Sequence, residues 1–227
     1  MSKLEKVIAI IPALNEEKTI EGVLQRVKRY VDEIVLIDDG SRDKTSEIAS
    51  KYAIVSKNPQ NLGYDKSLAN GFEIARKRGA TIVVTLDADG QHLPEEIPLF
   101  TNQILNGEAE VVVGKRPYKA RFMEEIFGNY AKRKIGIGDP LCGFKSYNIG
   151  VYDKIGFFDN IQSIGTQLLF TASKLGYKIK EIPISLNERK GTTRFGRQIR
   201  GNIKLFKAYK RLIKYLKSPL LNLENGN

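Results

Sequence analysis

The chain has 227 residues, 41% of them apolar and 28% charged, a balance that suits one globular α/β domain with a sizeable core. One cysteine, Cys142, and one histidine, His92, exclude a disulfide framework, argue against a zinc site and favour a reducing compartment. No apolar run reaches the roughly 18 residues that cross a bilayer, and no signal peptide is visible. We therefore expect a cytoplasmic protein.

The formal net charge is +11, and the basic residues that produce it gather near the C-terminus. Between Arg189 and Leu223 eleven residues are basic and none is acidic, so the rest of the chain is close to neutral. This surplus favours an anionic membrane face or a phosphorylated substrate. Because a nucleic-acid-binding domain more often spreads its charge over a folded face, we expect no nucleic acid partner.

Short apolar strands alternate with helices along the chain. We expect strands at 7–11, 33–37, 53–56, 81–86 and 110–114, and helices at 15–30, 41–52, 63–78, 94–106 and 122–134. Pro12 should stop the first strand, whereas Pro94 suits the first turn of a helix. Further along we expect strands at 144–147 and 178–182 and a helix at 166–175. The alternation predicts a mostly parallel sheet with helices on both faces.

Polar segments follow four of these strands, at 12–16, 38–39, 87–91 and 114–116. Because ligands bind beyond the carboxyl ends of strands in such sheets, we expect the four segments to converge. Asp87, Asp89 and Gln91 follow a buried strand at alternate positions, and oxygen ligands suit Mg²⁺ or Mn²⁺, which would hold substrate phosphates. The alternative for this stretch is an ordinary turn, where Asp and Gly are common.

No glycine-rich phosphate loop follows the first strand. Neither the pattern of a dinucleotide-binding Rossmann site nor that of a P-loop NTPase is present. Phosphates at this site would therefore need a metal ion and arginines.

The C-terminal stretch 197–217 has the pattern of a basic amphipathic helix. Its apolar residues recur at helical spacing: Ile199, Ile203, Phe206, Ile213, Leu216 and, just beyond, Leu220. Such a helix suits an anionic membrane surface. The alternative is that its apolar stripe packs on the domain. We therefore divide the chain into a domain over 1–196 and a tail over 197–227.

Several motifs occur in the order typical of family 2 glycosyltransferases, and this resemblance covers about residues 6–196. They are Ile11-Pro12-Ala13-Leu14-Asn15-Glu16, Asp38-Asp39-Gly40-Ser41, Asn61-Leu62-Gly63, Asp87-Ala88-Asp89-Gly90-Gln91-His92, Gly114-Lys115-Arg116, Asp139-Pro140-Leu141-Cys142-Gly143-Phe144, Glu181-Ile182-Pro183-Ile184 and Arg189-Lys190-Gly191-Thr192-Thr193-Arg194. Within the family, the chain most resembles dolichyl-phosphate mannose synthases and related polyprenyl-phosphate sugar transferases.

The resemblance implies a GT-A fold, a nucleotide-sugar donor, a divalent metal and inversion at the anomeric carbon. It also implies the following site residues: Pro12, Leu14, Glu16, Ile37 and Asp39 for the nucleoside; Asp87, Ala88 and Asp89 for the metal and diphosphate, with Gln91 as a further metal ligand; and Arg116, Arg189 and Arg194 for phosphates of donor and acceptor. Arg189 and Arg194 flank Gly191, a candidate hinge for a closing loop.

Three positions depart from the mannose-synthase pattern. Leu14 stands where Tyr is usual, so base stacking is lost there and the donor base stays open between GDP and UDP sugars. Arg194 stands where Lys is common, on a loop one residue shorter, and Gln167 stands where an acidic residue is common.

The nature of the acceptor decides whether the reaction needs a base. A phosphate monoester is already largely dianionic at neutral pH, whereas a hydroxyl must lose a proton. Asp139 is the candidate base for a hydroxyl, or else it binds backbone in the glycine-rich loop 136–143. His92 either orients phosphates or caps the helix that begins at Pro94.

We therefore expect a hexosyltransferase that moves one mannose or glucose from a GDP- or UDP-sugar to a polyprenyl phosphate at the cytoplasmic face of a membrane. The expected catalytic residues are Asp89, Asp139, Arg116, Arg189 and Arg194. Two alternatives remain: transfer to a saccharide hydroxyl with Asp139 as base, and a non-catalytic nucleotide-binding module at a membrane surface.

Overall fold

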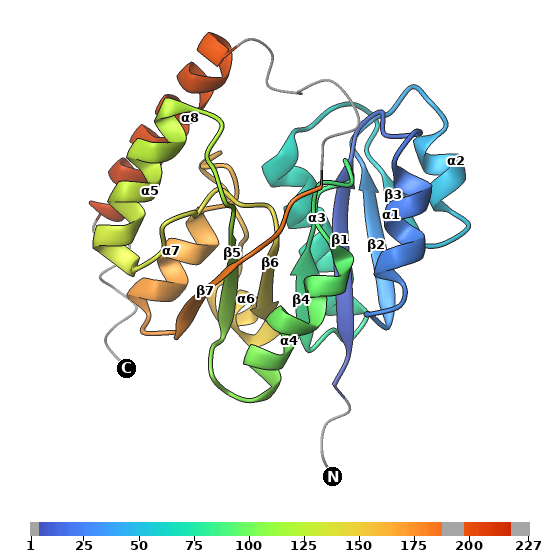
Figure 1. The fold of residues 1–227 in the computed structure, drawn as a ribbon, viewed down its shortest axis with the longest axis horizontal. Coiled ribbons are helices and arrows are strands. Elements are labelled where there is room, and N and C mark those ends of the chain that lie inside the picture. The colour runs from blue at the N-terminus through green and yellow to red at the C-terminus, as the bar shows by residue number, and fades with distance from the viewer. Residues whose placement is uncertain (1–4, 188–197, 219–227) are drawn as a thin grey trace.

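A seven-stranded sheet forms the centre of the fold in the computed structural model, which describes residues 5–187 and 198–218 (Figure 1). The strands lie in the order β3-β2-β1-β4-β6-β5-β7. Their bounds are β1 (Val7–Ala13), β2 (Glu33–Asp38), β3 (Ile54–Lys57), β4 (Ile82–Thr85), β5 (Val111–Lys115), β6 (Lys145–Asn148) and β7 (Ile179–Pro183). Only β6 runs antiparallel to its neighbours, which confirms the prediction of a mostly parallel sheet.

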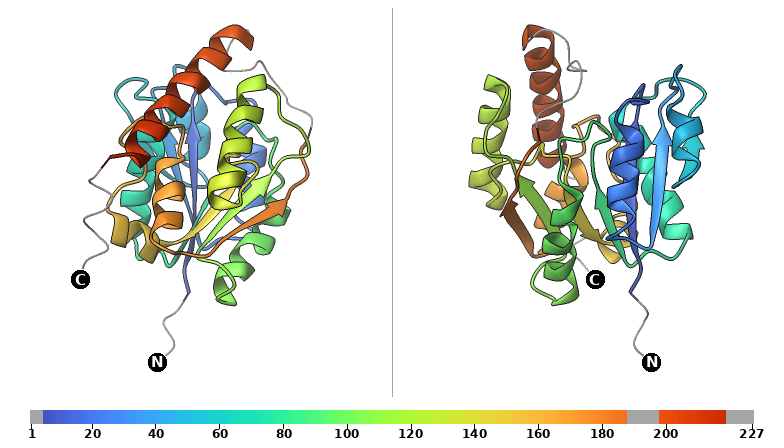
Figure 2. Two further views of the ribbon diagram at one scale, coloured as in Figure 1. Left: turned by 90° about the vertical axis from the view of Figure 1, so that its left-hand side faces the viewer. Right: turned by 45° about the vertical axis from the view of Figure 1, so that its right-hand side comes forward.

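Helices cover both faces of this sheet (Figures 1 and 2). One face packs against α1 (Ile20–Val27), α2 (Thr45–Ala49) and α4 (Ile97–Leu105), which follows a 3-10 turn at Pro94–Glu96. The other face packs against α3 (Tyr64–Lys77), α6 (Ile149–Ile155) and α7 (Gln167–Lys174). Alternation along β1 explains the two cores, because Ala9 and Ile11 point to the first face and Ile8 and Ile10 to the second.

The start of the chain differs from the expectation in two places. Pro12 does not stop β1, which continues to Ala13. The backbone oxygen of Ala13 accepts a hydrogen bond from Asp39 N on the β2 side, so the nitrogen of Pro12 points to the opposite side, toward β4. The residue pairs between β1 and β4 end at Thr85, so proline at position 12 removes no hydrogen bond between paired residues of the two strands. Helix α1 begins at Ile20 rather than Asn15, because Asn15 has a φ of 54° that a right-handed helix cannot contain.

Helix α8 (Gln198–Leu216) packs beside α5 (Phe122–Ile135), and the two helices run parallel (Figure 2). Leu205, Ala208 and Leu212 are buried on the domain side. Tyr209 stands edge-on to Phe127, with ring centroids 5.4 Å apart. The expected boundary between domain and tail falls in 188–197, outside the described residues, and α8 itself is packed on the domain. None of the described helices is long and apolar enough to cross a membrane.

Candidate active site

A cavity of about 570 Å³ lies at the carboxyl ends of β1, β2, β4 and β5. Nine of the residues expected at the site line it: Pro12, Leu14, Glu16, Asp39, Asp87, Ala88, Asp89, Gln91 and Arg116. A second hollow of about 430 Å³ shares Leu14 and Asn61 with this cavity. The expected convergence of polar segments from several strands is therefore present.

The loop after β2 is fixed by Asp38 and Asp39, which have different partners. Asp39 accepts hydrogen bonds from Asn58 Nδ2 at 2.9 Å and from the backbone N–H groups of Leu62 and Gly63 at 2.8 and 2.9 Å. It thereby holds the Asn61-Leu62-Gly63 segment beside the cavity. The backbone at Gly40 has a φ of 82°, and an added Cβ would lie 2.8 Å from Gln60 backbone carbon, so only glycine fits there.

Asp38 lies beneath this loop and takes no part in the cavity lining. It is fully buried and accepts hydrogen bonds from Ser41 N at 2.7 Å and from the Ser46 hydroxyl. Burial opposes ionisation, but these hydrogen bonds outweigh it and hold the pKa of Asp38 below its usual range. Asp38 is thus a structural carboxylate that shapes the loop from below.

The loop after β4 presents two carboxylates to the cavity. Gly143 from the next motif lies directly behind Asp87, because an added Cβ there would be 2.6 Å from both Asp87 carboxylate oxygens. Thr85 Oγ1 donates to Gly143 O at 2.7 Å and fixes this contact. Asp89 Oδ1 accepts from Gln91 N at 3.1 Å, which tightens the turn. Asp87, Asp89 and Gln91 therefore offer oxygen atoms from one short turn.

His92 supports this turn from inside the protein. It is 5% exposed, its Nδ1 accepts from Asp87 N at 3.2 Å, and its ring packs against Phe144 with centroids 5.5 Å apart. The expected helix cap is not formed, because Leu93 occupies the N-cap position before Pro94. His92 also lines the cavity, so it meets the site directly as well as through the backbone N–H of Asp87.

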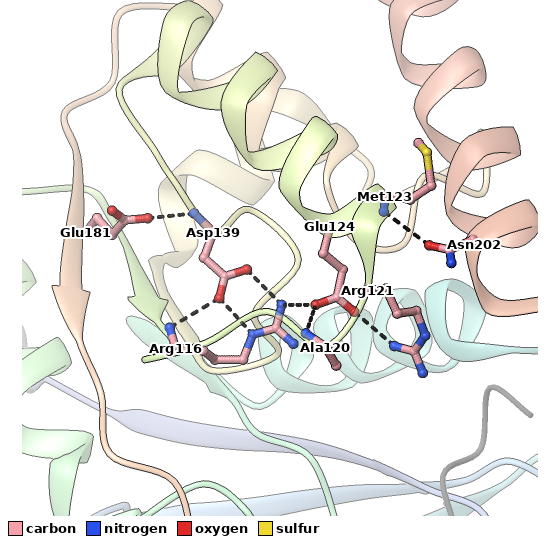
Figure 3. A network of polar contacts seen from close by, with 8 residues as sticks. All are labelled: Arg116, Ala120, Arg121, Met123, Glu124, Asp139, Glu181 and Asn202. Atoms are coloured by element: carbon pink, nitrogen blue, oxygen red, sulfur yellow. Dashed lines mark hydrogen bonds and ion pairs between the residues drawn. The ribbon is translucent and has the colours of Figure 1, made fainter. Parts of the chain in front are cut away.

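Arg116 enters the cavity at the end of β5 and is held by two carboxylates (Figure 3). Its Nε and Nη2 donate to the two oxygens of Asp139 at 2.7 and 2.8 Å, and Nη2 lies 3.2 Å from Glu124 Oε2. Burial opposes the charge of the guanidinium, but the hydrogen bonds to Asp139 outweigh it and raise the pKa of Arg116. Arg116 is therefore a fixed cation with a defined orientation.

Glu124 and Arg121 extend this network toward α8. Glu124 is 4% exposed and accepts from Arg121 Nη1 at 2.9 Å and Ala120 N at 3.2 Å (Figure 3). Asn202 Oδ1 on α8 accepts from Met123 N at 3.1 Å. Lys204 and Leu205 of α8 also line the cavity. Arg121, Glu124 and Lys204 were not predicted, because residues that meet only through the packing of α5 on α8 leave no local motif.

The remaining expected residues fall outside the cavity. Ile37 does not line the cavity, in contrast to the expectation, because its side chain is fully buried in the core beneath the loop after β2. Asp139 is 2% exposed and lies behind Arg116, outside the cavity lining, with its N–H donating to Glu181 Oε1 at 2.7 Å. Arg189 and Arg194 lie outside the described residues.

Cys142 takes no part in polar chemistry. The thiol is fully buried, and burial raises the pKa of Cys142 to about 12. It therefore stays protonated and serves as packing beneath the site.

Comparison with known proteins identifies the family of this chain. The sequence profile of glycosyl transferase family 2 matches residues 8–162. Polyprenol monophosphomannose synthase of Mycolicibacterium smegmatis is 26% identical over 210 residues, or 82% of this chain and 78% of that protein. UDP-N-acetylglucosamine--dolichyl-phosphate N-acetylglucosaminyltransferase of Methanococcus voltae is 36% identical over 126 residues, or 47% of this chain and 50% of that protein.

The fold also matches a solved structure. Glucosyl-3-phosphoglycerate synthase from Mycobacterium tuberculosis, in complex with Mn²⁺, UDP and glucosyl-3-phosphoglycerate, aligns with a TM-score of 0.69 at 21% identity, covering 92% of this chain and 80% of that chain. This likeness identifies the fold as GT-A. The chain belongs to glycosyl transferase family 2 and is a hexosyltransferase-type enzyme.

Proposed function

We propose that this enzyme moves one hexose, mannose or glucose, from a GDP- or UDP-sugar to a polyprenyl phosphate. The observation that carries the proposal is the charge pattern of one cavity. Asp87 and Asp89 line it after β4, while Arg116, Arg121 and Lys204 also line it. The two aspartates would bind the donor diphosphate through a metal ion, and the three basic side chains would bind the acceptor phosphate.

The residues after β4 fit a divalent metal. Asp87 and Asp89 supply carboxylate oxygens and Gln91 an amide oxygen, the donor set that Mg²⁺ and Mn²⁺ prefer. Because Gly143 has no side chain, the Asp87 carboxylate fits against its backbone, and any side chain at position 143 would displace that carboxylate. We propose that these three residues hold the ion, which would neutralise charge on the leaving diphosphate. The presence of Mn²⁺ and UDP in glucosyl-3-phosphoglycerate synthase supports this assignment.

The nucleoside half of the donor is proposed to lie near Leu14 and Asp39. Leu14, Pro12, Glu16 and Asp39 line the main cavity, and the second hollow continues past Leu14 toward Gly40, Arg42 and Lys57. Without an aromatic side chain at position 14, the base cannot stack on that residue. The hollow therefore offers space for either uracil or guanine.

In the proposed reaction, an acceptor phosphate oxygen forms a bond to the anomeric carbon as the bond from that carbon to the donor diphosphate breaks. Attack from the opposite side inverts the configuration. The phosphate is already ionised and loses no proton. Arg116 contributes a fixed positive charge, with Asp139 and Glu124 keeping it in place before the reaction begins. Arg189 and Arg194 are proposed to add positive charge from the loop outside the described residues.

The names of the relatives support a lipid phosphate as acceptor, since one is a polyprenol and another a dolichyl-phosphate transferase. Such an acceptor places the enzyme at a membrane, and we propose the anionic cytoplasmic face. The buried free thiol of Cys142 is typical of proteins in a reducing compartment.

A hydroxyl acceptor is the second candidate, favoured by the fold match to glucosyl-3-phosphoglycerate synthase, whose name states a phosphorylated small-molecule product. Asp139 would be the base, but both of its oxygens accept hydrogen bonds from Arg116. Deprotonating a substrate would break that pair, so this candidate ranks second. Membership in an enzyme family weighs against the non-catalytic alternative.

The test is a donor and acceptor panel with the purified protein. GDP-mannose, GDP-glucose, UDP-glucose and UDP-N-acetylglucosamine are incubated with Mn²⁺ and either a short-chain polyprenyl phosphate or an oligosaccharide, and labelled product is measured. We expect lipid product with one of the mannose or glucose donors and not with UDP-N-acetylglucosamine, and loss of at least about 100-fold in Asp89→Ala, consistent with an electrostatic role. Product on the oligosaccharide alone, or none with any donor, would overturn the proposal.

A further inference from the structure

Most of the exposed large apolar side chains of the described residues belong to two helices that pack on each other, α5 and α8. Of the seven large apolar side chains that are exposed among the described residues, one is the first residue of α5 and three lie in the first half of α8: Phe122 (73%), Ile199 (74%), Ile203 (51%) and Phe206 (48%). We name these four residues the α5–α8 patch. A fifth, Tyr118, precedes α5. Figure 1 shows that both helices begin at the same end of the molecule, toward which β1 also runs.

The sequence of α8 forms three stripes rather than the two of an ordinary amphipathic helix. Leu205, Ala208 and Leu212 face the domain and are buried. Ile199, Ile203 and Phe206, at positions i, i+4 and i+7, form a second apolar stripe that the described residues leave exposed. A helix that only packed on its own domain would need the first apolar stripe alone. The second stripe therefore indicates contact with a further apolar surface outside the domain.

The charge on α8 indicates which apolar surface this is. The helix has six basic residues and no acidic one: Arg200, Lys204, Lys207, Lys210, Arg211 and Lys214. Lys207, Arg211 and Lys214 form the third stripe, directly beside the exposed apolar one. Such a surface matches an anionic bilayer, which offers negative headgroups above an apolar interior. A second copy of this chain would instead bring the same positive charges together.

The patch also borders the cavity. Lys204 and Leu205, which line the cavity, lie between Ile203 and Phe206 in the chain, and Arg121, which also lines it, precedes Phe122. We infer that the α5–α8 patch docks on an anionic lipid bilayer and sets the cavity beside the headgroups. The inference rests on the proposed function, since a lipid-bound acceptor phosphate would then lie at the level of Arg121 and Lys204.

The test is co-sedimentation of the full chain with vesicles of phosphatidylcholine alone and of phosphatidylcholine with 30% phosphatidylglycerol, roughly the range in which polybasic segments respond to surface charge. The test variant carries Ile199→Ser, Ile203→Ser and Phe206→Ser. Its control carries Leu99→Ser and Leu105→Ser, the two exposed leucines of α4. We expect the wild type and the control to bind anionic vesicles about tenfold more tightly than neutral ones, and the patch variant to lose at least about tenfold.

Equal binding of the patch variant and the control would overturn the inference. So would a concentration-dependent dimer that the patch variant alone fails to form, because the patch would then belong to a second copy. Transfer to a short-chain acceptor in the absence of vesicles separates this result from the proposed function. The patch variant should retain that activity, and its thermal unfolding should match that of the control.

If the wild type binds vesicles through the patch but transfers no sugar, the proposed function fails and the docking surface stands. If it transfers sugar to the short-chain acceptor but binds no vesicle, the docking surface fails and the function stands.

Discussion

Arg116 and Asp139 form a two-point ion pair behind the cavity, with Nε to Oδ2 at 2.7 Å and Nη2 to Oδ1 at 2.8 Å. The backbone N–H of Arg116 also reaches Asp139 Oδ2 at 3.2 Å. Planar guanidinium and carboxylate groups matched in this way fix direction as well as distance. The pair therefore makes Asp139 an orienting group for a phosphate-binding arginine in our proposal.

Replacing Asp139 by Asn should misplace Arg116 and leave its buried charge with one partner fewer. We expect transfer to fall by about 100-fold and the free energy of unfolding to fall by about 3 kcal/mol, the usual result of breaking a buried pair. The decisive measurement is the pH dependence of kcat. A base at position 139 would give wild type an acidic limb that the variant lacks, whereas an orienting role leaves the shape of the profile unchanged.

Glu124 links Arg116 and Arg121 at the cavity rim, and Glu125 beside it is exposed. Glu124→Gln should loosen both arginines, raising KM for the acceptor by about tenfold, because a charge-assisted hydrogen bond contributes about 1.5–3 kcal/mol. Glu125→Gln provides the control and should be neutral. Steady-state kinetics with acceptor varied at saturating donor checks this. Equal effects of the two substitutions would show that the network does not position the arginines.

Gly143 should be irreplaceable for metal binding. An added Cβ would lie 2.6 Å from both Asp87 carboxylate oxygens, so Gly143→Ala must displace that carboxylate. We expect Mn²⁺ affinity to fall by about 10- to 100-fold, as for other changes that disturb the support of a metal ligand. Isothermal titration with Mn²⁺ and nucleoside diphosphate measures it. Gly22→Ala, on α1 with open space around it, is the control. Unchanged Mn²⁺ affinity in Gly143→Ala would remove Asp87 from the proposed ligands.

Asp65 should lower the free energy of unfolding as pH rises, the opposite of the usual effect of a carboxylate that is stabilised by an ion pair. Burial and the nearby charge of Asp159 raise the pKa of Asp65 to about 7, and its Oδ1 is buried without a hydrogen-bond partner among the described residues. In the unfolded chain the group ionises near pH 3.9. Between about pH 4 and 7 the unfolded state loses this proton first, so Asp65 lowers stability progressively as pH rises and most above pH 7.

Asp65→Asn removes this titration. The difference in Tm between the variant and the wild type should therefore increase from pH 4 to pH 7 and then level off, corresponding to at most about 4 kcal/mol. Thermal unfolding across pH 4–8 measures it, with exposed Asp153→Asn as the control. A difference that is constant with pH would mean that Asp65 is ionised in the folded protein throughout this range.

The sequence by itself determined the sheet and the edge at which the candidate site lies. Apolar runs such as Ile8 to Ile11 are local signals of buried parallel strands, and polar residues directly after them must lie at one edge. The Asp87 to Gln91 turn was predictable in part, because Asp89 accepts a hydrogen bond from Gln91 N within its own short segment, whereas the contact of Asp87 with Gly143 comes from the tertiary structure.

Only the tertiary structure decided which distant residues meet. Asp139 and Arg116 are 23 positions apart, and neither shows in its own neighbourhood that it would bind the other. The sequence identified α8 as apolar and basic but could not divide its apolar residues between the domain and a second surface. That division depends on the packing of α8 against α5, which buries Leu205, Ala208 and Leu212 and leaves Ile199, Ile203 and Phe206 outside. Periodicity reports that a helix has an apolar face, while only contacts between elements show what that face covers.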